Sequence, residues 1–390
     1  KSGYYIAEIS PSPSHAKVSA PLSEISGFTF EPSAYISDPS CFDFVKWKKC
    51  SARVFNDYTD QLLFESDPQG EPILRFEISK YLYSSRGVTT SPEQIVIGAG
   101  TQQITSHLSR ILIKMGLRLV CLEEPGYLPV QSMFRDAGFT ISHIPVASDG
   151  IEIAKLPANI QSAVYVNPSN QFPTGAVMPV GRRYELLDWA AQNNSIIIED
   201  DYDSEFRYKG KPIPALQGSD SNGKVIYTGT FSKSLAPSIR MSYMVLPEHI
   251  LKIYQEKCRF ISSTVSKVDQ MILQKFMEEG YYERHLNKTR ALYKNRHDVL
   301  ISSLRKMKEI LEISGENAGV HLLLHFKTDD SEKDLIEKAA KQGVRVYGLS
   351  EYCVKDNEDS TGKAVILLGY ANMNEERIRA AVQLLCKAWE

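Results

Sequence analysis

The feature that most constrains the fold of this chain is an alternation of short apolar runs with amphipathic stretches between residues 94 and 246. Short apolar runs bounded by Gly, Pro or polar residues are typical of buried strands, and apolar residues at three- and four-residue steps are typical of helices. Strands that alternate with helices form a mostly parallel sheet covered on both faces. We predict strands at Gln94–Ile97, Arg118–Leu122, Phe139–Ile144, Ser162–Val166, Ser195–Glu199, Val225–Tyr227 and Met241–Leu246, and helices at Gln102–Lys114, Val130–Ala137 and Arg182–Gln192.

A chain of 390 residues is too long for one simple core, so we expect a large and a small domain. Beyond about Ile250 the pattern changes to that of an α+β domain, with strands predicted at Gly319–Phe326, Val344–Tyr347 and Ala364–Gly369. We place the large domain at residues 41–265 and the smaller C-terminal domain at residues 266–390. Residues 1–40 are rich in Ser and Pro and are predicted to form a linker.

Charge and cysteine usage exclude several classes of function. Lys and Arg number 45 and Asp and Glu 47, so the chain has no general attraction for nucleic acid or acidic membranes, and any DNA contact needs another domain. The six cysteines are scattered without metal-binding spacing, which favours reduced thiols in the cytoplasm, and no apolar run is long enough to span a bilayer. The first residue is Lys rather than Met, so we expect the chain to begin inside a longer polypeptide.

A polar centre between the last two predicted strands holds Lys233 among Thr and Ser hydroxyls, and Arg240 follows seven residues later. Burial of a lysine disfavours its charged form, so its pKa falls and its amine becomes nucleophilic. The alternative is a surface loop with an ordinary solvated lysine. This stretch alone does not decide between the two.

Other polar residues follow other predicted strands, at the edge where ligands of parallel sheets bind. Gly100, Thr101 and Gln102 open a helix and form a candidate phosphate cradle, or a partial dinucleotide fingerprint. Tyr127 is a stacking platform for a flat ring, or an ordinary turn aromatic. Asp200 suits a protonated ring nitrogen, and Tyr202 a neighbouring ring oxygen.

This set of residues describes a site for pyridoxal phosphate (PLP), with Lys233 as the nucleophile and no metal. Two further motifs are set aside. The run Gly218–Lys224 resembles a nucleotide-binding loop but precedes a strand, so we expect a surface turn. His321 and His325 resemble a metal pair, but on a strand they lie about 13 Å apart, so we expect structural roles.

Several motifs carry a family resemblance that covers Asp38 to Glu390. They are Asp67-Pro-Gln-Gly-Glu-Pro-Ile-Leu-Arg75, Tyr81-Leu-Tyr-Ser-Ser-Arg-Gly-Val88, Asn170-Gln-Phe-Pro-Thr-Gly175, Glu199-Asp-Asp-Tyr-Asp-Ser-Glu-Phe-Arg-Tyr208, Gly229-Thr-Phe-Ser-Lys-Ser234 and Leu368-Gly-Tyr-Ala371. The chain resembles fold-type-I PLP proteins, and more narrowly the effector-binding domain of MocR/GabR-type regulators of the GntR family. This resemblance implies a large domain with a mostly parallel seven-stranded sheet, a smaller α+β domain and a homodimer.

The resemblance also assigns roles to residues. Lys233 would form the internal aldimine, Asp200 would pair with the pyridine nitrogen, Tyr202 would bond the phenolic oxygen and Tyr127 would stack on the ring. The phosphate would be surrounded by Gly100, Thr101, Gln102, Ser232 and Arg240. The opening residues, Lys1-Ser-Gly-Tyr-Tyr-Ile-Ala7, resemble the last strand of a winged helix, which implies a DNA-binding domain upstream.

Three positions in the expected effector pocket depart from the family pattern. Phe172 stands where aminotransferases have an Asn that bonds the ring oxygen, and Leu367 stands where they have an Arg that grips the substrate carboxylate. Glu351 stands where some regulators have an Arg for an acidic effector. Efficient transamination of ordinary amino acids and a GABA-like effector are therefore disfavoured, and a ligand with a second amine, or one bound by other groups, fits better.

The resulting prediction is a ligand sensor. An amine-bearing effector displaces Lys233 and stays as an external aldimine, the small domain closes, and the linker passes the movement to the winged helix. Such a regulator would be cytoplasmic, bacterial and bound to the nucleoid when full length. An active PLP-dependent aminotransferase and a sensor of PLP itself remain as alternatives.

Overall fold

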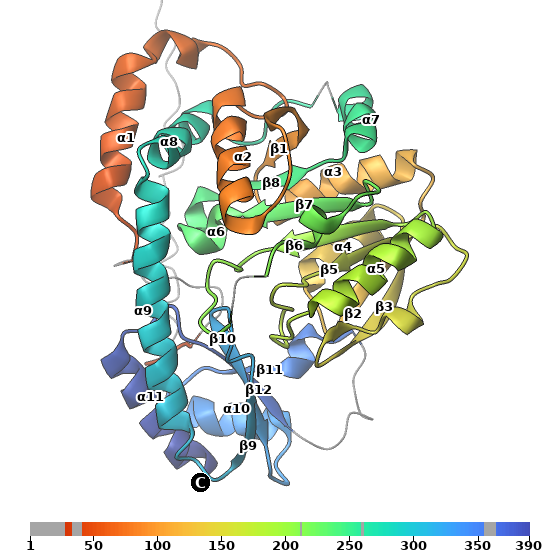
Figure 1. The fold of residues 1–390 in the computed structure, drawn as a ribbon. Helices are drawn as coiled ribbons and strands as arrows, with labels where there is room; N and C mark the ends of the chain where they lie inside the picture. The colour runs from red at the N-terminus through yellow and green to blue at the C-terminus, as the bar shows by residue number, and fades with distance from the viewer. Residues whose placement is uncertain (1–27, 33–40, 211–212, 259–260, 355–363) are drawn as a thin grey trace, which may run out of the picture.

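The structure is a computed structural model that describes residues 28–32, 41–210, 213–258, 261–354 and 364–390 (Figure 1). Apart from residues 28–32, the linker predicted over residues 1–40 lies outside the described residues, as do the opening residues that resemble a wing strand. Within the described ranges, no helix combines the length and the apolar character needed to cross a membrane.

The larger of two sheets has the order β1-β8-β7-β6-β5-β2-β3-β4. Neighbouring strands from β7 to β3 run parallel, whereas β8 is antiparallel to both β1 and β7, and β4 to β3. The strands are β1 (Ile95–Gly98), β2 (Leu119–Glu124), β3 (Thr140–Ala147), β4 (Gly150–Ile151), β5 (Ala163–Val166), β6 (Ile196–Asp201), β7 (Val225–Thr230) and β8 (Ser242–Val245).

The mostly parallel sheet is confirmed, but the predicted number of seven strands is wrong. The eighth strand is β4, which has two residues and pairs antiparallel with β3, and its first residue, Gly150, has a φ of +104°. A strand of two residues is too short to have a hydrophobic period, so the sequence pattern could not reveal it.

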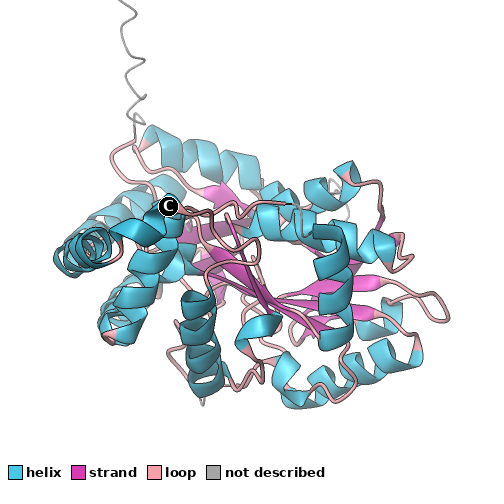
Figure 2. Cartoon of the chain, turned by 90° about the horizontal axis from the view of Figure 1, so that it is seen from above, coloured by secondary structure: helices cyan, strands magenta, loops and turns pink. Residues whose placement is uncertain are grey.

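Helices cover both faces of this sheet (Figure 2). Alternate residues of a strand point to opposite faces of the sheet. On one face, Ile196 and Ile198 pack with α3 (Thr101–Lys114), α4 (Leu128–Asp136) and α7 (Glu248–Cys258). On the other face, Ile197 packs with α5 (Val180–Gln192). At the β1–β8 edge, a third cluster packs under α1 (Phe44–Asp57), α2 (Pro72–Arg86) and α8 (Lys267–Glu278). These buried clusters fix the strand ends on which the site is built.

The smaller sheet is antiparallel, with the order β11-β12-β10-β9. It packs with α10 (Glu332–Lys341), α11 (Glu375–Trp389) and the C-terminal half of α9 (Tyr281–Leu304), whose N-terminal half packs into the large domain. The boundary placed at residue 265 stays a prediction. The strands are β9 (Ile310–Ser314), β10 (His321–Phe326), β11 (Tyr347–Gly348) and β12 (Val365–Gly369).

The segment 28–32 is attached to the small domain. Phe30 forms a parallel bridge with Val344, where the sequence predicted a longer strand, and the Arg345 N–H donates to the Phe30 carbonyl at 2.9 Å. The Gly369 N–H donates to the Pro32 carbonyl at 2.8 Å. Segment 28–32 therefore packs on the small domain, although it precedes the large domain in the sequence.

Candidate functional site

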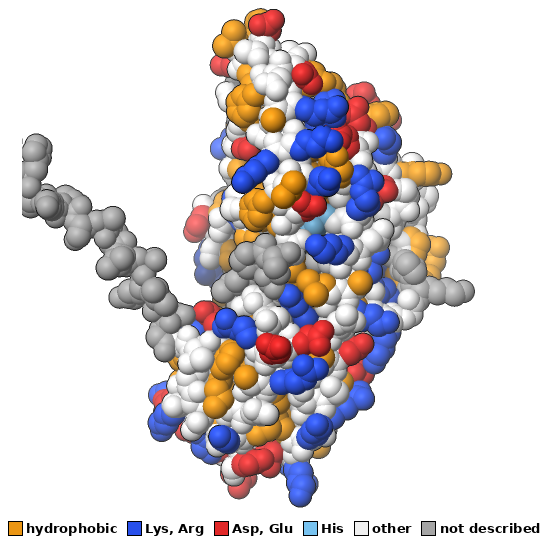
Figure 3. All heavy atoms as spheres, turned by 90° about the vertical axis from the view of Figure 1, so that its left-hand side faces the viewer, with side chains coloured by type: hydrophobic (Ala, Val, Ile, Leu, Met, Phe, Trp, Pro, Cys, Tyr) orange, Lys and Arg blue, Asp and Glu red, His pale blue; other side chains and the backbone are white. Residues whose placement is uncertain are grey.

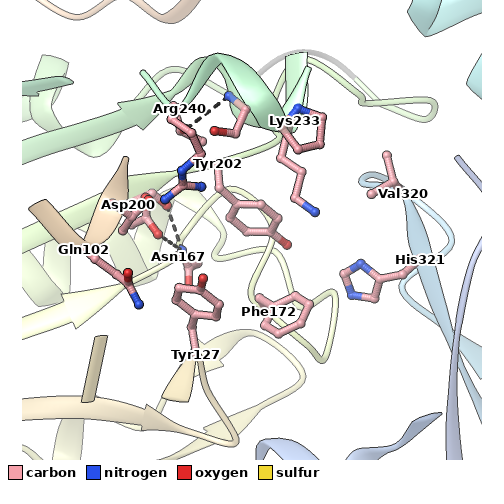
Figure 4. Close-up of a pocket in the computed structure, with 14 residues that line it drawn as sticks. Gln102, Tyr127, Asn167, Phe172, Asp200, Tyr202, Lys233, Arg240, Val320 and His321 are labelled. Atoms are coloured by element: carbon pink, nitrogen blue, oxygen red, sulfur yellow. Dashed lines mark hydrogen bonds between the residues drawn. The ribbon is translucent and has the colours of Figure 1, made fainter. Parts of the chain in front are cut away.

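A cavity of about 400 Å³ lies where the strand ends of the large sheet meet the small domain (Figure 4). Because β1, β2, β5, β6 and β7 run in the same direction, the residues that follow them lie at one edge of the sheet. The lining residues are Thr101, Gln102, Tyr127, Asn167, Phe172, Asp200, Tyr202, Thr230, Ser232, Lys233, Pro237, Arg240, Val320 and His321. The structure therefore brings together most of the predicted site residues.

Lys233 lies on α6 (Phe231–Ser234), a one-turn helix that follows β7 directly. The side chain of Thr230 caps this turn by accepting a hydrogen bond from the Ser232 N–H at 3.2 Å. Burial lowers the pKa of the Lys233 amine to about 8, and the nearby Asp203 carboxylate opposes this shift. Lys233 is thus a partly buried amine on a short helix rather than a solvated lysine on a loop.

Asp200 is buried at the end of β6 and holds its carboxylate through three hydrogen bonds. The Tyr165 hydroxyl donates to it at 2.6 Å, and Asn167 Nδ2 and the Thr228 hydroxyl donate to it at 3.2 Å. Burial raises the pKa of Asp200 to about 6, against the effect of these hydrogen bonds. A fixed and poorly solvated carboxylate of this kind suits a cationic ring nitrogen.

The other end of the cavity has the properties of an anion site. Thr101 opens α3, so the first N–H groups of that helix lack partners within the helix. Gly100 has a φ of +86°, and a Cβ there would collide with the guanidinium of Arg240. The buried Ser232 hydroxyl has no hydrogen-bond partner among the described residues. Arg240 itself has a positive φ of 47°, which is uncommon outside Gly.

Aromatic side chains border the cavity between these two ends. Tyr127 and Tyr202 each face the ring of Phe172 edge-on, with centroid distances of 6.2 and 6.1 Å (Figure 4). The Tyr202 hydroxyl accepts a hydrogen bond from Asn170 Nδ2 at 3.1 Å. The space between these rings is therefore apolar on its faces and polar at one edge, as a flat heteroaromatic ring requires.

The three residues predicted for the effector pocket have different locations. Phe172 lines the cavity, whereas Leu367 does not line it and belongs with Phe172 to a buried cluster that also contains Leu323 and Tyr352. Glu351 does not line the cavity. It belongs to a 3₁₀ turn, where its carboxylate accepts a hydrogen bond from the Gly348 N–H at 3.3 Å.

Five lining residues were not predicted. Asn167 and Thr230 stand at strand ends and could have been found by the rule that located Asp200. Val320 and His321 come from the small domain, and Pro237 from a turn after α6, and no sequence pattern linked them to this edge. His321 and His325 have separate partners, Pro173 and Ser314, and in the described part of the chain no cluster of His, Cys, Asp and Glu could hold a metal ion.

Comparison with known proteins identifies the family. The model for "Aminotransferase class I and II" matches residues 44–385. The chain belongs to the aminotransferase class I and II family. PLP is the cofactor of this fold, and the residues of the cavity fit it: the crowded Gly100, the unpartnered Ser232 hydroxyl and the buried Asp200 carboxylate each suit one part of the cofactor.

Within this family the chain groups with MocR-type transcription regulators. It is 40% identical to the uncharacterized HTH-type transcriptional regulator YhdI of Bacillus subtilis over 90% of this chain and 74% of that protein. It is 34% identical to the probable rhizopine catabolism regulatory protein MocR of Rhizobium meliloti, over 82% of this chain and 64% of that protein.

Solved structures of aminotransferases share the fold. The kynurenine aminotransferase of Pyrococcus horikoshii superposes with a TM-score of 0.82 at 25% identity, covering 94% of this chain and 91% of that one. The multiple substrate aminotransferase of Thermococcus profundus gives the same TM-score at 26% identity, with 94% and 92% covered.

Proposed function

We propose that this chain is the effector-sensing domain of a PLP-dependent transcription regulator. The observation that carries the proposal is the placement of Lys233, Asp200 and Tyr202 in one cavity, beside a buried apolar cluster that contains Phe172 and Leu367. The HTH-type regulators among its relatives support a regulatory role. DNA binding would come from a segment upstream of this chain.

When bound, PLP supplies an aldehyde carbon that reacts reversibly with primary amines. The Lys233 amine is the group that would hold it covalently, and its lowered pKa of about 8 keeps a useful fraction unprotonated near neutral pH. Asp200 would keep a proton on the ring nitrogen, and Tyr202 would donate to the ring oxygen. Tyr127 would cover one face of the ring.

The phosphate group of PLP would lie at the anion site. Thr101 and Gln102 would offer the start of α3, Ser232 its hydroxyl and Arg240 its guanidinium, with Gly100 leaving room for close approach. A guanidinium and several N–H donors suit a dianion.

Sensing is favoured over turnover by the apolar side of the cavity. Phe172 and Leu367 provide no charge-assisted hydrogen bond to a substrate carboxylate, a contact worth about 1.5–3 kcal/mol per bond. Val320 and His321 of the small domain line the same cavity, so an effector would contact both domains. Occupancy would thereby bias the position of the small domain and of the attached segment 28–32.

A homodimer is part of the proposal. The side of the molecule that carries α1 has hydrophobic side chains on its surface among basic ones (Figure 3). The exposed large apolar residues on α1, α2 and the turn between them are Phe44, Val45, Phe55, Leu63, Phe64, Ile73, Phe76 and Tyr83. Exposed apolar residues that gather on one face mark interaction surfaces, and a second copy of the chain is the partner that we expect.

Absorbance spectroscopy with site-directed variants tests the proposal. The native protein with PLP should show an absorbance band of covalently held cofactor, and borohydride should fix the cofactor on Lys233. Lys233→Ala should lose both signals completely, whereas the exposed control Lys252→Ala should keep them. The proposal would be wrong if Lys233→Ala retained cofactor that borohydride can fix.

Transamination is the second candidate, because the fold superposes on working aminotransferases with a TM-score of 0.82. The discriminating measurement is product formation with a panel of ordinary amino acids and a keto acid acceptor. We expect slow or absent turnover, because the apolar cluster of Phe172 and Leu367 offers no charged group to a substrate carboxylate. Rapid turnover with many amino acids would replace the sensor proposal with that of an enzyme.

A further inference from the structure

His321 is the polar residue that the small domain contributes to the cavity. It is the first residue of β10, its side chain is 2% exposed, and its ring lies 5.2 Å from the ring of Phe172, at 67° to it. Figure 4 shows its imidazole on the opposite side of the cavity from Arg240 and Gln102. His321 therefore faces the end of the cavity that the cofactor's phosphate would not occupy.

The hydrogen bonding of His321 fixes its protonation. Its Nε2 lies 3.0 Å from the carbonyl oxygen of Pro173, and a carbonyl only accepts, so Nε2 carries the hydrogen. Burial lowers the pKa of this imidazole to about 4, so the ring is neutral at physiological pH. Nδ1 is then a hydrogen-bond acceptor only.

This acceptor has no partner. His321 Nδ1 is buried and makes no hydrogen bond with any described residue. A buried acceptor that is left unpaired destabilises the state that contains it, because its hydration is lost without replacement. A ligand that brings a donor to this point would remove that penalty, so the acceptor selects among ligands.

The surroundings restrict the kind of donor. The neighbours of His321 at this end include the apolar side chains of Val320 and Phe172, and the Lys233 amine is near enough to help lower the pKa of His321. The acidic residue among the lining residues, Asp200, already accepts three hydrogen bonds. The Asp203 carboxyl, which acts on the Lys233 amine, does not line the cavity and accepts hydrogen bonds from Asn170 Nδ2. An ammonium group beside His321 would therefore find no anionic partner among the lining residues, and a carboxylate would face a lone pair rather than a donor.

We propose that His321 determines effector specificity by accepting a hydrogen bond at Nδ1 from a hydroxyl of the effector, whose chemical class is a small amino alcohol. The proposal rests on the proposed function, since the effector's amine is taken to react at the position of the Lys233 amine. The cavity of about 400 Å³ must also hold the cofactor, which leaves room only for a short molecule.

A series of amines matched in size tests the proposal on the PLP-loaded chain. The probes are 3-amino-1-propanol, butylamine, 1,3-diaminopropane and β-alanine, together with the homologues one carbon shorter and longer. Affinities are measured by calorimetry and by the change in cofactor absorbance. We expect the best amino alcohol to bind about tenfold more tightly than its methyl-ended counterpart, and more tightly than the diamine and the amino acid. Equal binding of alcohol and alkyl amine, or a preference for β-alanine, would overturn the proposal.

Two substitutions of His321 test the roles of its two ring nitrogens separately. In His321→Gln the side-chain amide reaches the position of Nε2 and can still donate to Pro173, but no acceptor remains at Nδ1. In His321→Asn the amide oxygen lies near the position of Nδ1. We expect His321→Gln to lose the hydroxyl preference while keeping its affinity for butylamine, and His321→Asn to keep part of the preference. His325→Gln, on the same strand but bonded to Ser314, is the control and should change neither affinity.

Two readouts keep the outcomes distinct. Nitrogen NMR of labelled histidine in the native protein should show a neutral imidazole with hydrogen on Nε2, and hydrogen on Nδ1 would overturn the assignment. If PLP is held on Lys233 but His321→Gln keeps the full hydroxyl preference, the inference about His321 is wrong and the proposed function stands. If no cofactor is held on Lys233, the proposed function fails and this inference fails with it.

Discussion

The two sides of the cavity are built in different ways. The cofactor side consists of polar residues that end or follow strands, such as Asp200, which accepts hydrogen bonds within the large domain, and Thr101 at the start of α3. The effector side is lined by Phe172, which packs in a buried cluster with Tyr352 and Leu367, and by His321, a buried acceptor. In the proposed function, the first side would determine which chemistry is available, and the second which amine can use it. Substitutions on the two sides should therefore have separable effects.

The largest effect is expected for Leu367→Arg on the effector side. Leu367 is 0% exposed on β12, opposite Leu323, so an arginine there buries a charge without a partner. We expect a loss of about 3 kcal/mol or more in the free energy of unfolding, measured by urea denaturation. Leu311→Arg, at a position that is 51% exposed on β9, is the control and should change stability by less than about 0.5 kcal/mol. If Leu367→Arg kept its stability and gained affinity for amino-acid carboxylates, an arginine would be accommodated at this position and would bind the carboxylate.

Asp200→Asn, on the cofactor side, should weaken PLP binding without lowering stability. Loss of a charged partner for the ring nitrogen should weaken PLP binding by about 10- to 100-fold. Stability at pH 7 should not fall, because burial raises the folded-state pKa of Asp200 to about 6. The folded protein therefore binds this proton more tightly than the unfolded chain, and the free energy of unfolding falls as the pH rises from the unfolded pKa of Asp200 to about 6. Asparagine does not titrate, so Asp200→Asn removes this loss of stability. Exposed Asp188→Asn is the control, and equal PLP affinity in the two variants would contradict the assigned role.

The pH dependence of PLP uptake sharpens the comparison further. Burial lowers the pKa of Lys233 to about 8, so the reactive neutral amine should rise about tenfold between pH 7 and pH 9. We expect the rate of covalent uptake, followed by absorbance, to rise with a midpoint near pH 8. A midpoint near the ordinary lysine value would mean that the amine is solvated when PLP arrives.

Gly100→Ala should have a smaller effect that is limited to the phosphate end. Gly100 and Gly116 share a φ of +86°, so an alanine at either position should cost roughly 1 kcal/mol of stability. A Cβ at Gly100 would also collide with Arg240, whereas one at Gly116 would meet nothing within 4 Å. We therefore expect Gly100→Ala to weaken PLP binding several-fold beyond Gly116→Ala, as measured by titration. Equal affinities would show that Arg240 does not depend on this glycine.

The difference between the two sides also explains what the sequence could predict. Lys233, Asp200 and Tyr127 follow strands whose apolar pattern is local, and parallel strands bring their ends together. The roles given to them, first from their chemistry at strand ends and then from the family resemblance, remain proposals. His321 could not be found in this way, because its place depends on how the small domain packs against the large one. Likewise β9, with two exposed residues among five, has no clear alternation to reveal it.

The attachment of segment 28–32 has a mechanical consequence. Because Phe30 and Pro32 are bonded to the small domain through Arg345 and Gly369, residue 28 is a fixed point on that domain. A rotation of the small domain by any angle displaces residue 28 in proportion to its distance from the rotation axis. Segment 28–32 therefore follows any rotation of the small domain.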